Sequence, residues 1–344
     1  MTAVGAHLVG GLKADTAEEA MRRAAGALGT RLYRLTDGET GPRAQWIWWQ
    51  IDKLLALPGV RMGPPKINAE SGNPDYEQFP GLDVDPGTTI PPRHLGYADA
   101  AIESYAVFRC LREEGLVAPG VRFQVSLPTA YAVIVAWVNA PTRAFFDEFE
   151  RAMLAEVEAI VAAVPTQDLA IQWDVAVEIG AIEGVFAPSA DLAGEAFIVE
   201  ALRRAVRAVR PPAAVGIHFC YGDYRHRHFT VPRDLSIPVR LANAVLAETV
   251  LDFVHMPVDR ESGLEAGYFA PLAGLPSGPS LALGVIDYEN DADRIDRLVA
   301  AADATGRTYA VATECGMSRL GERGEAVTLV DLLAQHARVS AAIR

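Results

Sequence analysis

Eight short runs rich in apolar and β-branched residues recur along the chain and alternate with longer segments of helical period. In order they are AHLVGG (6–11), RLYRLTDGE (31–39), VRFQVSLP (121–128), LAIQWDVAVE (169–178), AVGIHFCYG (214–222), LDFVHMPV (251–258), SLALGVID (280–287) and TYAVATECG (308–316). This alternation is typical of βα units around a parallel sheet. Because composition shows no linker-like shift, the sequence predicts an α/β fold: a single (β/α)8 TIM barrel domain over residues 1–344. A doubly wound open sheet is the alternative, although no GxGxxG motif follows the first run.

One segment interrupts this rhythm between the second and third predicted strands. Residues 63–94, GPPKINAESGNPDYEQFPGLDVDPGTTIPPRH, are rich in proline, glycine and acidic residues. Connections of this length in compact domains are commonly functional or mobile. We predict a flap-like insertion that lies over one end of the barrel.

Composition limits the partners and the compartment. The formal net charge is −13, so neither nucleic acid nor an anionic membrane is expected to attract the protein. No apolar run is long enough for a transmembrane helix, and the N-terminal sequence lacks a signal-peptide pattern. The three cysteines are too few for a disulfide framework, which favours a reducing, cytoplasmic compartment. Cys110, on a predicted helix, is expected to be an inert core residue.

Polar and ionisable residues concentrate at the carboxyl ends of the predicted strands. In a (β/α)8 barrel these ends meet on one face, where the chemistry takes place. The residues are Asp37, Glu39, Ser126, Asp174, Glu178, His218, Cys220, His255, Asp287, Glu289, Glu314 and Cys315. Strand ends are often polar simply because loops follow them, and this is the alternative interpretation. Two of the three cysteines belong to this set, however, which favours a functional site.

His218 and Cys220 lie two residues apart on the fifth predicted strand, so their side chains point to the same face. Cys315, at the end of the eighth predicted strand, brings a second thiolate toward that face. One imidazole and two thiolates form a soft, tetrahedral ligand set that suits Zn²⁺. The alternative is a buried cysteine beside a histidine with satisfied hydrogen bonds. His226 and His228 follow in an RHRH sequence, where alternation with arginine predicts a solvated or anion-facing loop.

A thiolate-rich zinc site suits one kind of chemistry. A metal with an open coordination position can bind a thiol and lower its pKa, so that the thiolate exists near neutral pH. Such a thiolate attacks a carbon electrophile. Alkyl transfer to sulfur therefore fits this ligand set better than hydrolysis, for which His, Asp and Glu ligands are more common.

Along most of its length the chain resembles a divergent member of a known family. The matching segments are His218-Phe219-Cys220-Tyr221 (H-x-C-Y), Glu314-Cys315-Gly316-Met317-Ser318-Arg319 (D-C-G-L-x-x-R), Asp37-Gly38-Glu39 with Arg43 (G-E-x-x-R), Ile171-Gln172-Trp173-Asp174 with Glu178 (I-Q-I-D-E-P-A-L-R-E), Ser126-Leu127-Pro128-Thr129 with Trp137 (T-G-P-V-T…W) and Leu283-Gly284-Val285-Ile286-Asp287 (the seventh-strand motif). These are similar to motifs in the C-terminal catalytic barrel of cobalamin-independent methionine synthase, in the methionine synthase/uroporphyrinogen decarboxylase-like superfamily.

The resemblance implies a role for each matching residue. It implies zinc ligation by His218, Cys220 and Cys315, and substrate binding by Glu39, Arg43, Ser126, Asp174 and Glu178. In the family the matching glutamate and aspartate contact homocysteine, and the glutamate holds its amino group. Glu39 and Asp174 are therefore expected to hold a substrate ammonium.

Two positions depart from the family pattern. The third zinc ligand of the family is a glutamate at the end of the sixth strand, where this sequence has Pro257. His255, Asp259 or a water molecule could take its place, or the metal could be absent. The family's catalytic histidine follows the seventh-strand aspartate, and here Glu289 follows Asp287. The implied catalytic pair is Asp287 and Glu289, with Glu289 as the acid if the leaving group needs a proton.

Residues and resemblance together predict an enzyme of methionine biosynthesis, a zinc-dependent methyl or alkyl transferase that activates a homocysteine-like thiol. Its partners would be a small-molecule thiol and a methyl donor, with no nucleic acid and no membrane. The folate-binding signature is not recognisable in the insertion, so methyltetrahydrofolate is not implied as the donor. The sequence leaves open whether the enzyme needs an accessory protein or forms a homo-oligomer.

Two alternatives remain beside the transferase. A metal-assisted lyase that cleaves a carbon–sulfur bond would use the same ligands, and a second, donor-shaped pocket beneath the insertion would distinguish the two. A non-catalytic relative would need a partner protein for its missing parts, and any activity would depend on that partner.

Overall fold

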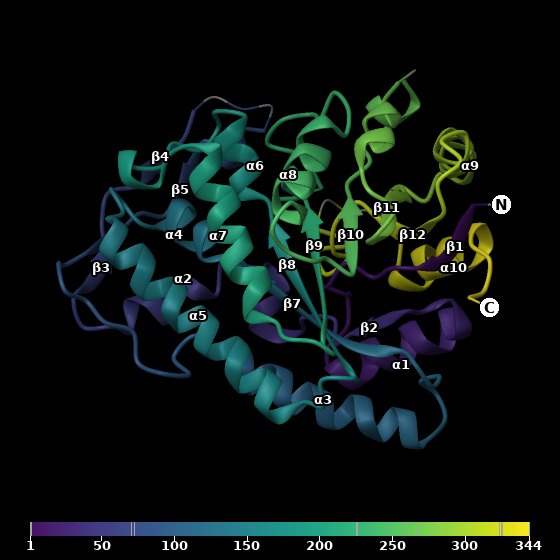
Figure 1. Cartoon of the computed structure of the whole chain (residues 1–344), viewed down its shortest axis with the longest axis horizontal. Coiled ribbons are helices and arrows are strands. Elements are labelled where there is room, and N and C mark those ends of the chain that lie inside the picture. Colours follow the sequence, from purple (N-terminus) through teal and green to yellow (C-terminus); the bar gives the residue numbers. More distant parts are fainter. Residues whose placement is uncertain are drawn as a thin grey trace.

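The computed structural model describes residues 2–69, 71, 73–224, 226–265, 267–322, 324 and 326–343. Its centre is an eight-stranded parallel sheet in the order β1-β12-β11-β10-β9-β8-β7-β2 (Figure 1). The strands are β1 (Ala3–Ala6), β2 (Arg34–Thr36), β7 (Arg122–Pro128), β8 (Leu169–Val175), β9 (Ala214–Phe219), β10 (Phe253–Met256), β11 (Ser280–Ile286) and β12 (Tyr309–Thr313). The predicted α/β fold with a parallel sheet is confirmed.

The strands at the two ends of the sheet order differ most from the prediction. β1 occupies residues 3–6 instead of 6–11, and its pairing with β12 shifts register between Ala3 and Ala6. Near β2 the N-terminal segment makes isolated bridges, from Ala6 to Leu32 and from Gly11 to Gly38. No continuous ladder joins β1 and β2 in the described residues. The curled sheet is therefore established, and the closed barrel stays a prediction.

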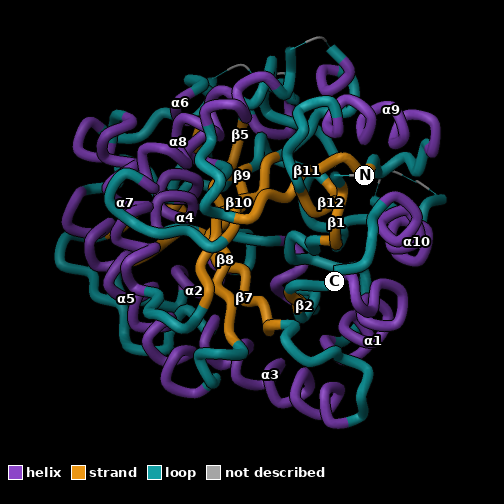
Figure 2. The backbone as a smooth tube through the Cα atoms, turned by 45° about the vertical axis from the view of Figure 1, so that its right-hand side comes forward, coloured by secondary structure: helices purple, strands orange, loops and turns teal. Residues whose placement is uncertain are grey.

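Helices lie outside the sheet, as Figure 2 shows. They are α1 (Ala17–Leu28), α2 (Gln50–Leu55), α3 (Tyr97–Glu113), α4 (Ala130–Trp137), α5 (Arg143–Ala163), α6 (Val177–Ile182), α7 (Glu195–Ala208), α8 (Ser236–Leu246), α9 (Ala292–Asp303) and α10 (Leu329–Val339). Thr16, Thr129, Thr142 and Thr328 begin four of them, each accepting a hydrogen bond from a first-turn backbone N–H. Between β10 and β11 the described residues form only short 3₁₀ turns, so strict strand–helix alternation is broken there.

The insertion forms two small antiparallel ladders instead of an irregular loop. β3 (Val60–Met62) pairs with β6 (Leu82–Val84), and β4 (Lys66–Ile67) pairs with β5 (Gln78–Phe79). Two of its aromatic side chains, Tyr76 and Phe79, are buried. The insertion is thus anchored to the rest of the molecule by packed rings, and its movement as a flap stays a prediction.

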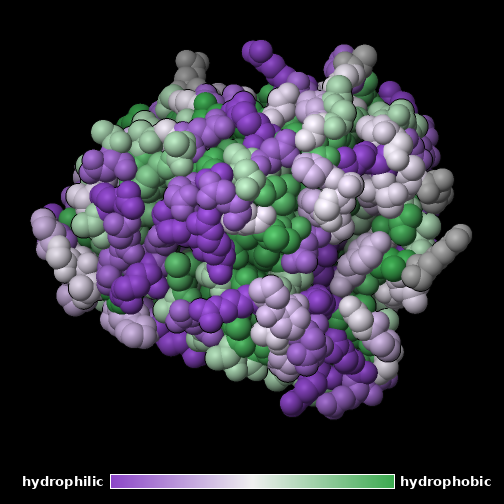
Figure 3. Space-filling model, in the orientation of Figure 1, coloured by the Kyte–Doolittle hydropathy of each residue, from purple (hydrophilic) through white to green (hydrophobic). Residues whose placement is uncertain are grey.

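On the face drawn in Figure 3, hydrophilic and hydrophobic side chains are interspersed. Among the residues that the structure describes, no helix is both long enough and apolar enough to cross a bilayer.

Close packing between β11 and β12 depends on a glycine. A Cβ on Gly284 would lie 2.7 Å from the Cα atom of Glu314, which belongs to the backbone that follows β12. Because backbone cannot rotate away, a side chain here would push the two segments apart. Gly26, on the exposed face of α1, has no atom within 4 Å of the equivalent point. The two glycines form a matched pair, one required by packing and one not.

We expect Gly284→Ala to lower the free energy of unfolding by about 1–3 kcal/mol, because the added methyl group overpacks the sheet. Gly26→Ala should raise it by roughly 0.5–1 kcal/mol, since alanine is the better helix former. Urea unfolding followed by circular dichroism measures both. Similar effects from the two substitutions would contradict the close approach of the segments.

Candidate metal centre and its cavity

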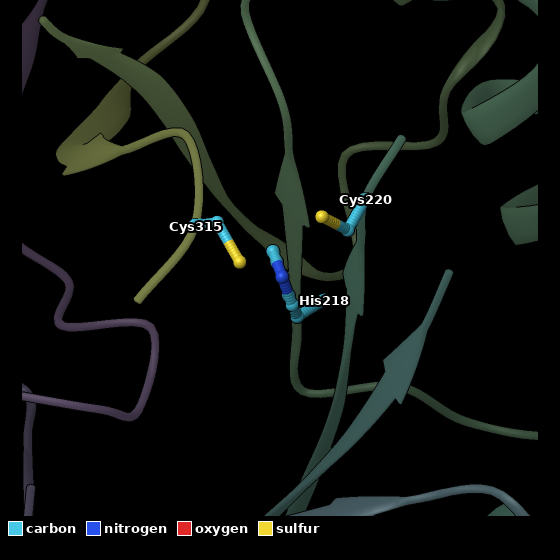
Figure 4. A group of neighbouring side chains, drawn as sticks. All are labelled: His218, Cys220 and Cys315. Atoms are coloured by element: carbon cyan, nitrogen blue, oxygen red, sulfur yellow. The ribbon is translucent and has the colours of Figure 1, made fainter. Parts of the chain in front are cut away.

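His218, Cys220 and Cys315 come together at the carboxyl ends of β9 and β12. One ligand atom from each residue lies within 4.8 Å of the other two. Figure 4 shows the three side chains pointing into a shared space. The backbone N–H of Cys220 donates to the carbonyl oxygen of Val175 at 2.9 Å, so pairing with β8 continues past the end of β9. This continuation keeps Cys220 on the same face as His218.

The donor set fits Zn²⁺. Zinc–ligand bonds of about 2.0–2.3 Å place tetrahedral ligand atoms roughly 3.5–3.8 Å apart. The three candidate ligand atoms would therefore need to move only slightly closer together to bind one ion. Hydrogen bonding with Cys315, together with burial, raises the pKa of the Cys220 thiol well above its usual range. Such a thiol ionises readily only beside a cation. Burial and the neighbouring His255 lower the pKa of His218, which keeps its imidazole in the neutral, ligating form.

His255 lies beside this group without belonging to it. It is paired in register with His218 across β9 and β10. Its Nδ1 lies 2.7 Å from Nδ1 of His218, and its Nε2 lies 3.0 Å from the carbonyl oxygen of Thr313. Both ring nitrogens therefore have protein partners. Asp259, the other proposed substitute, accepts hydrogen bonds from the backbone N–H groups of Glu261 and Ser262.

The three candidate ligands open into a cavity of about 90 Å³. Charged side chains in its wall include Arg43, Asp223 and Arg319. Its wall also has eight aromatic rings, those of Trp46, Trp48, Tyr76, Phe79, Trp137, Phe186, Tyr224 and Phe229. Tyr76 and Phe79 come from the insertion, so the insertion forms part of the cavity wall.

Glu39, Arg43 and Asp174 line the same cavity. Arg43 binds Asp37 through two hydrogen bonds of 2.7 and 3.3 Å. Burial raises the pKa of Glu39 to about 7, and burial with the nearby Glu39 charge raises that of Asp174 well above its usual range. Within the described residues neither Glu39 nor Asp174 forms an ion pair of 4 Å or less. This pair of carboxylates is therefore suited to a cationic group on a ligand.

Ser126 and Glu178 do not line the cavity. The Ser126 hydroxyl donates to the carbonyl oxygen of Val9 at 3.1 Å. Glu178, in the first turn of α6, is fully buried and accepts a hydrogen bond from the hydroxyl of Thr129. Burial raises its pKa to about 7. Both side chains are held in contacts that support the fold.

Asp287 and Glu289 also lie outside the aromatic cavity. Arg294 lies 2.5 Å from the carboxylate of Asp287 and 2.9 Å from that of Glu289. Arg260 forms a second ion pair with Glu289 at 2.6 Å. Both members of the predicted catalytic pair thus form ion pairs with arginines, and neither lines the cavity of the candidate metal centre.

Tyr288 faces the centre instead and was not anticipated. Its hydroxyl accepts a hydrogen bond from the backbone N–H of Cys315 at 2.9 Å and donates to the carbonyl oxygen of Gly316 at 3.1 Å. The chain turns after β11, where the backbone N–H of Asn290 donates to the carbonyl oxygen of Asp287 at 3.0 Å, so strand alternation could not predict this contact.

Of the two alternatives predicted for His226 and His228, the solvated loop was wrong, and the anion-facing loop stays a prediction. His226 is 8% exposed, and its Nε2 lies 3.2 Å from the carbonyl oxygen of Arg319. The imidazole of His228 contacts the carboxylate of Glu314. Burial opposes protonation of His228, but Glu314 outweighs it and raises the pKa. The local sequence could not reveal this carboxylate, because it comes from the other end of the sheet.

Comparisons with known proteins support the fold. No family model matches the chain, and no curated protein matches its sequence. A Listeria monocytogenes structure, provisionally described as a vitamin-B12-independent methionine synthase, is 12% identical with a TM-score of 0.57 and covers 98% of this chain and 97% of its own. A B12-independent methionine synthase from Shewanella sp. W3-18-1, in complex with selenomethionine, is 16% identical with a TM-score of 0.52 over 94% and 87%. A methyltransferase from Methanosarcina mazei is 14% identical with a TM-score of 0.52 over 98% and 93%. At these identities the likeness establishes the fold.

The metal centre is tested by metal content. We expect about one zinc per chain in the native protein and little in Cys220→Ser or Cys315→Ser, because a hydroxyl is a poor replacement for thiolate. Cys110, predicted to be a core residue, is instead exposed on α3, so Cys110→Ser is a matched control that should keep its zinc. Elemental analysis of folded, dialysed protein decides the outcome. Equal zinc content in all four proteins would contradict the site.

Glu178 gives a pH-dependent prediction. The pKa of Glu178 is about 7 in the folded protein, above its ordinary value of 4.5. The protonated side chain therefore stabilises the fold fully below pH 4.5, and this stabilisation is lost as the pH rises through 7. Glu178→Gln removes this loss. We expect the free energy of unfolding of the variant, relative to that of the native protein, to be about 1–3 kcal/mol higher at pH 8 than at pH 4.5.

Urea unfolding at the two pH values measures this difference. Glu103→Gln, at an exposed position on α3, serves as the control and should show no comparable change. A pH-independent effect of Glu178→Gln would show that Glu178 is ionised in the folded protein.

Proposed function

We propose that this protein is a zinc-dependent, methionine-synthase-like transferase that moves a methyl or other alkyl group to an amino-thiol such as homocysteine. One observation carries the proposal: two thiols and an imidazole open into the same cavity as the Glu39–Asp174 pair. A metal that binds sulfur and carboxylates that bind an ammonium are the two features that an amino-thiol needs. The descriptions of the similar folds, methionine synthases and a methyltransferase, support the same class.

We also propose the setting in which the enzyme works. Residues 1–344 would form one closed (β/α)8 barrel domain that carries Zn²⁺ in the cytoplasm. The three cysteines are free, which agrees with a reducing compartment. Dependence on an accessory protein or on a second copy of the chain stays a prediction.

The chain's own residues would orient and shield the acceptor. Zinc would supply the charge that lowers the pKa of the substrate thiol. Glu39 and Asp174 would hold the ammonium, which fixes the distance between the amino group and the sulfur. The aromatic wall would exclude water, so that the thiolate is neither solvated nor reprotonated.

The transfer is a single substitution at carbon. The acceptor sulfur forms a bond to the methyl carbon while the bond between that carbon and the donor atom breaks, and its electron pair leaves with the donor. Much of the remaining cavity wall is aromatic or apolar, although Asp223 and Arg319 also belong to it, and its rings suit a donor with a planar body. A lyase would need no such region, so the rings of Tyr76 and Phe79 in the wall favour the transferase.

Binding of two related thiols tests this proposal. Homocysteine should bind the zinc-loaded protein about 10–100-fold more tightly than 4-mercaptobutanoate, which lacks the amino group, because a hydrogen bond to a charged group is worth about 1.5–3 kcal/mol. Asp174→Asn should largely remove this difference. Binding can be followed by the absorption of Co²⁺-substituted protein, where thiolate ligation changes the spectrum.

Asp85→Asn, at an exposed carboxylate on the insertion, is the control and should preserve the preference. A donor panel with mass detection of the thioether then tests transfer, with Cys220→Ser as the inactive reference. Equal affinity of the native protein for both thiols would contradict the proposed role of the carboxylates.

A further inference from the structure

We infer that His255 is a positioning residue: it fixes the tautomer of His218, so that His218 directs the lone pair of Nε2 toward Cys220 and Cys315. This assigns His255 a role other than that of the fourth ligand. The inference concerns the metal site of the proposed function, but its hydrogen bonds exist before any metal binds.

The contact between the two histidines is set by the sheet. His218 and His255 are partners in the parallel ladder of β9 and β10, so their side chains emerge side by side on one face. Their ring centroids are 4.7 Å apart and their Nδ1 atoms 2.7 Å apart. The side chains are 2% and 0% exposed, so water does not compete for these nitrogens.

The direction of each hydrogen bond follows from its partners. The carbonyl oxygen of Thr313 can only accept, so Nε2 of His255 must carry the hydrogen of the 3.0 Å contact. A second proton on the same ring would place a charge in the sheet interior, which is costly. Nδ1 of His255 therefore presents a lone pair. The hydrogen between the two rings then belongs to Nδ1 of His218.

This arrangement leaves Nε2 of His218 without a hydrogen. An imidazole binds a metal only through a nitrogen that has a free lone pair, so the opposite tautomer would block the site. Metal-binding histidines are usually oriented by a carboxylate, a carbonyl or water at the other nitrogen. Here a neutral imidazole takes that place, and it adds no negative charge to the two cysteines.

Thr313 ties this chain of hydrogen bonds to the third candidate ligand. Its carbonyl oxygen accepts from His255, while its hydroxyl donates to the carbonyl oxygen of Cys315 at 2.6 Å. The end of β12 thus holds Cys315 and, through His255, His218. Thr313 therefore helps to position candidate ligands at the ends of β9 and β12, two strands that are far apart in the sequence.

Three variants test the assignment by zinc affinity. His255→Leu removes the acceptor and should weaken zinc binding about 10–100-fold, the usual cost of losing such a partner. His255→Asn keeps an amide oxygen near the position of Nδ1 that can accept from His218, so it should lose less zinc affinity than His255→Leu even without the bond to Thr313. His336→Leu, at a fully buried histidine on α10, is the matched control and should bind zinc normally. Competition with a chromophoric chelator gives each Kd, and unchanged affinity in folded His255→Leu would overturn the role.

The tautomers can be read directly in the metal-free native protein. Long-range ¹H–¹⁵N spectra of the imidazoles should show the hydrogen on Nδ1 of His218 and on Nε2 of His255. The reverse assignment would overturn the inference, as would a ¹¹³Cd–¹⁵N coupling to His255 in the cadmium-loaded protein. The tautomer measurement needs neither a bound metal nor enzyme activity. If the protein shows these tautomers but does not bind zinc, the proposed function is refuted and the inferred tautomers stand.

Discussion

The parallel register of β8, β9 and β10 determines where the candidate site lies. His218 is opposite Asp174 on one side and opposite His255 on the other. The proposed metal ligand, the proposed substrate-binding carboxylate and the imidazole proposed to orient the ligand therefore form one row across three strands. Because side chains alternate with a period of two, a slip of one residue would turn a member of this row toward the helices. The cavity, the ligand group and the hydrogen bonds behind it all depend on this alignment.

A polar row inside a sheet is stable only if its members find partners. Gln172 supplies several: its amide nitrogen donates to Asp174 at 2.9 Å and also to the carbonyl oxygen of Val9. Gln124 donates to the carbonyl oxygen of Leu8 at 2.9 Å. Such bonds offset the cost of burying polar groups. Glu39 and Asp174 share the cavity with Arg43 and Arg319, but neither carboxylate forms an ion pair of 4 Å or less in the described residues, and this supports their proposed role in binding a ligand.

The sequence was sufficient where the information was local. Strand and helix periodicity predicted the parallel sheet, and the H-x-C spacing predicted that His218 and Cys220 share a face. It was insufficient where the partner lies on another element. Arg294, seven residues after Asp287, binds it from α9, and Glu314 contacts His228 from the end of β12; no local pattern announces either pairing. Whether a polar residue reaches the cavity or is satisfied elsewhere depends on such partners, which only the folded chain specifies.

The position of the acids bears on the donor. A donor that leaves as an anion needs a proton at the departing atom, whereas one that leaves from a cationic atom departs neutral and needs none. Asp287 and Glu289 are neutralised by arginines outside the cavity, so they are poorly placed to supply that proton. Inside the cavity the carboxyl groups of raised pKa are Glu39 and Asp174, and a substrate ammonium would favour their ionised forms. In the proposed transferase, a cavity that holds the acceptor would therefore have few protons to give, and this favours a donor whose leaving group requires none.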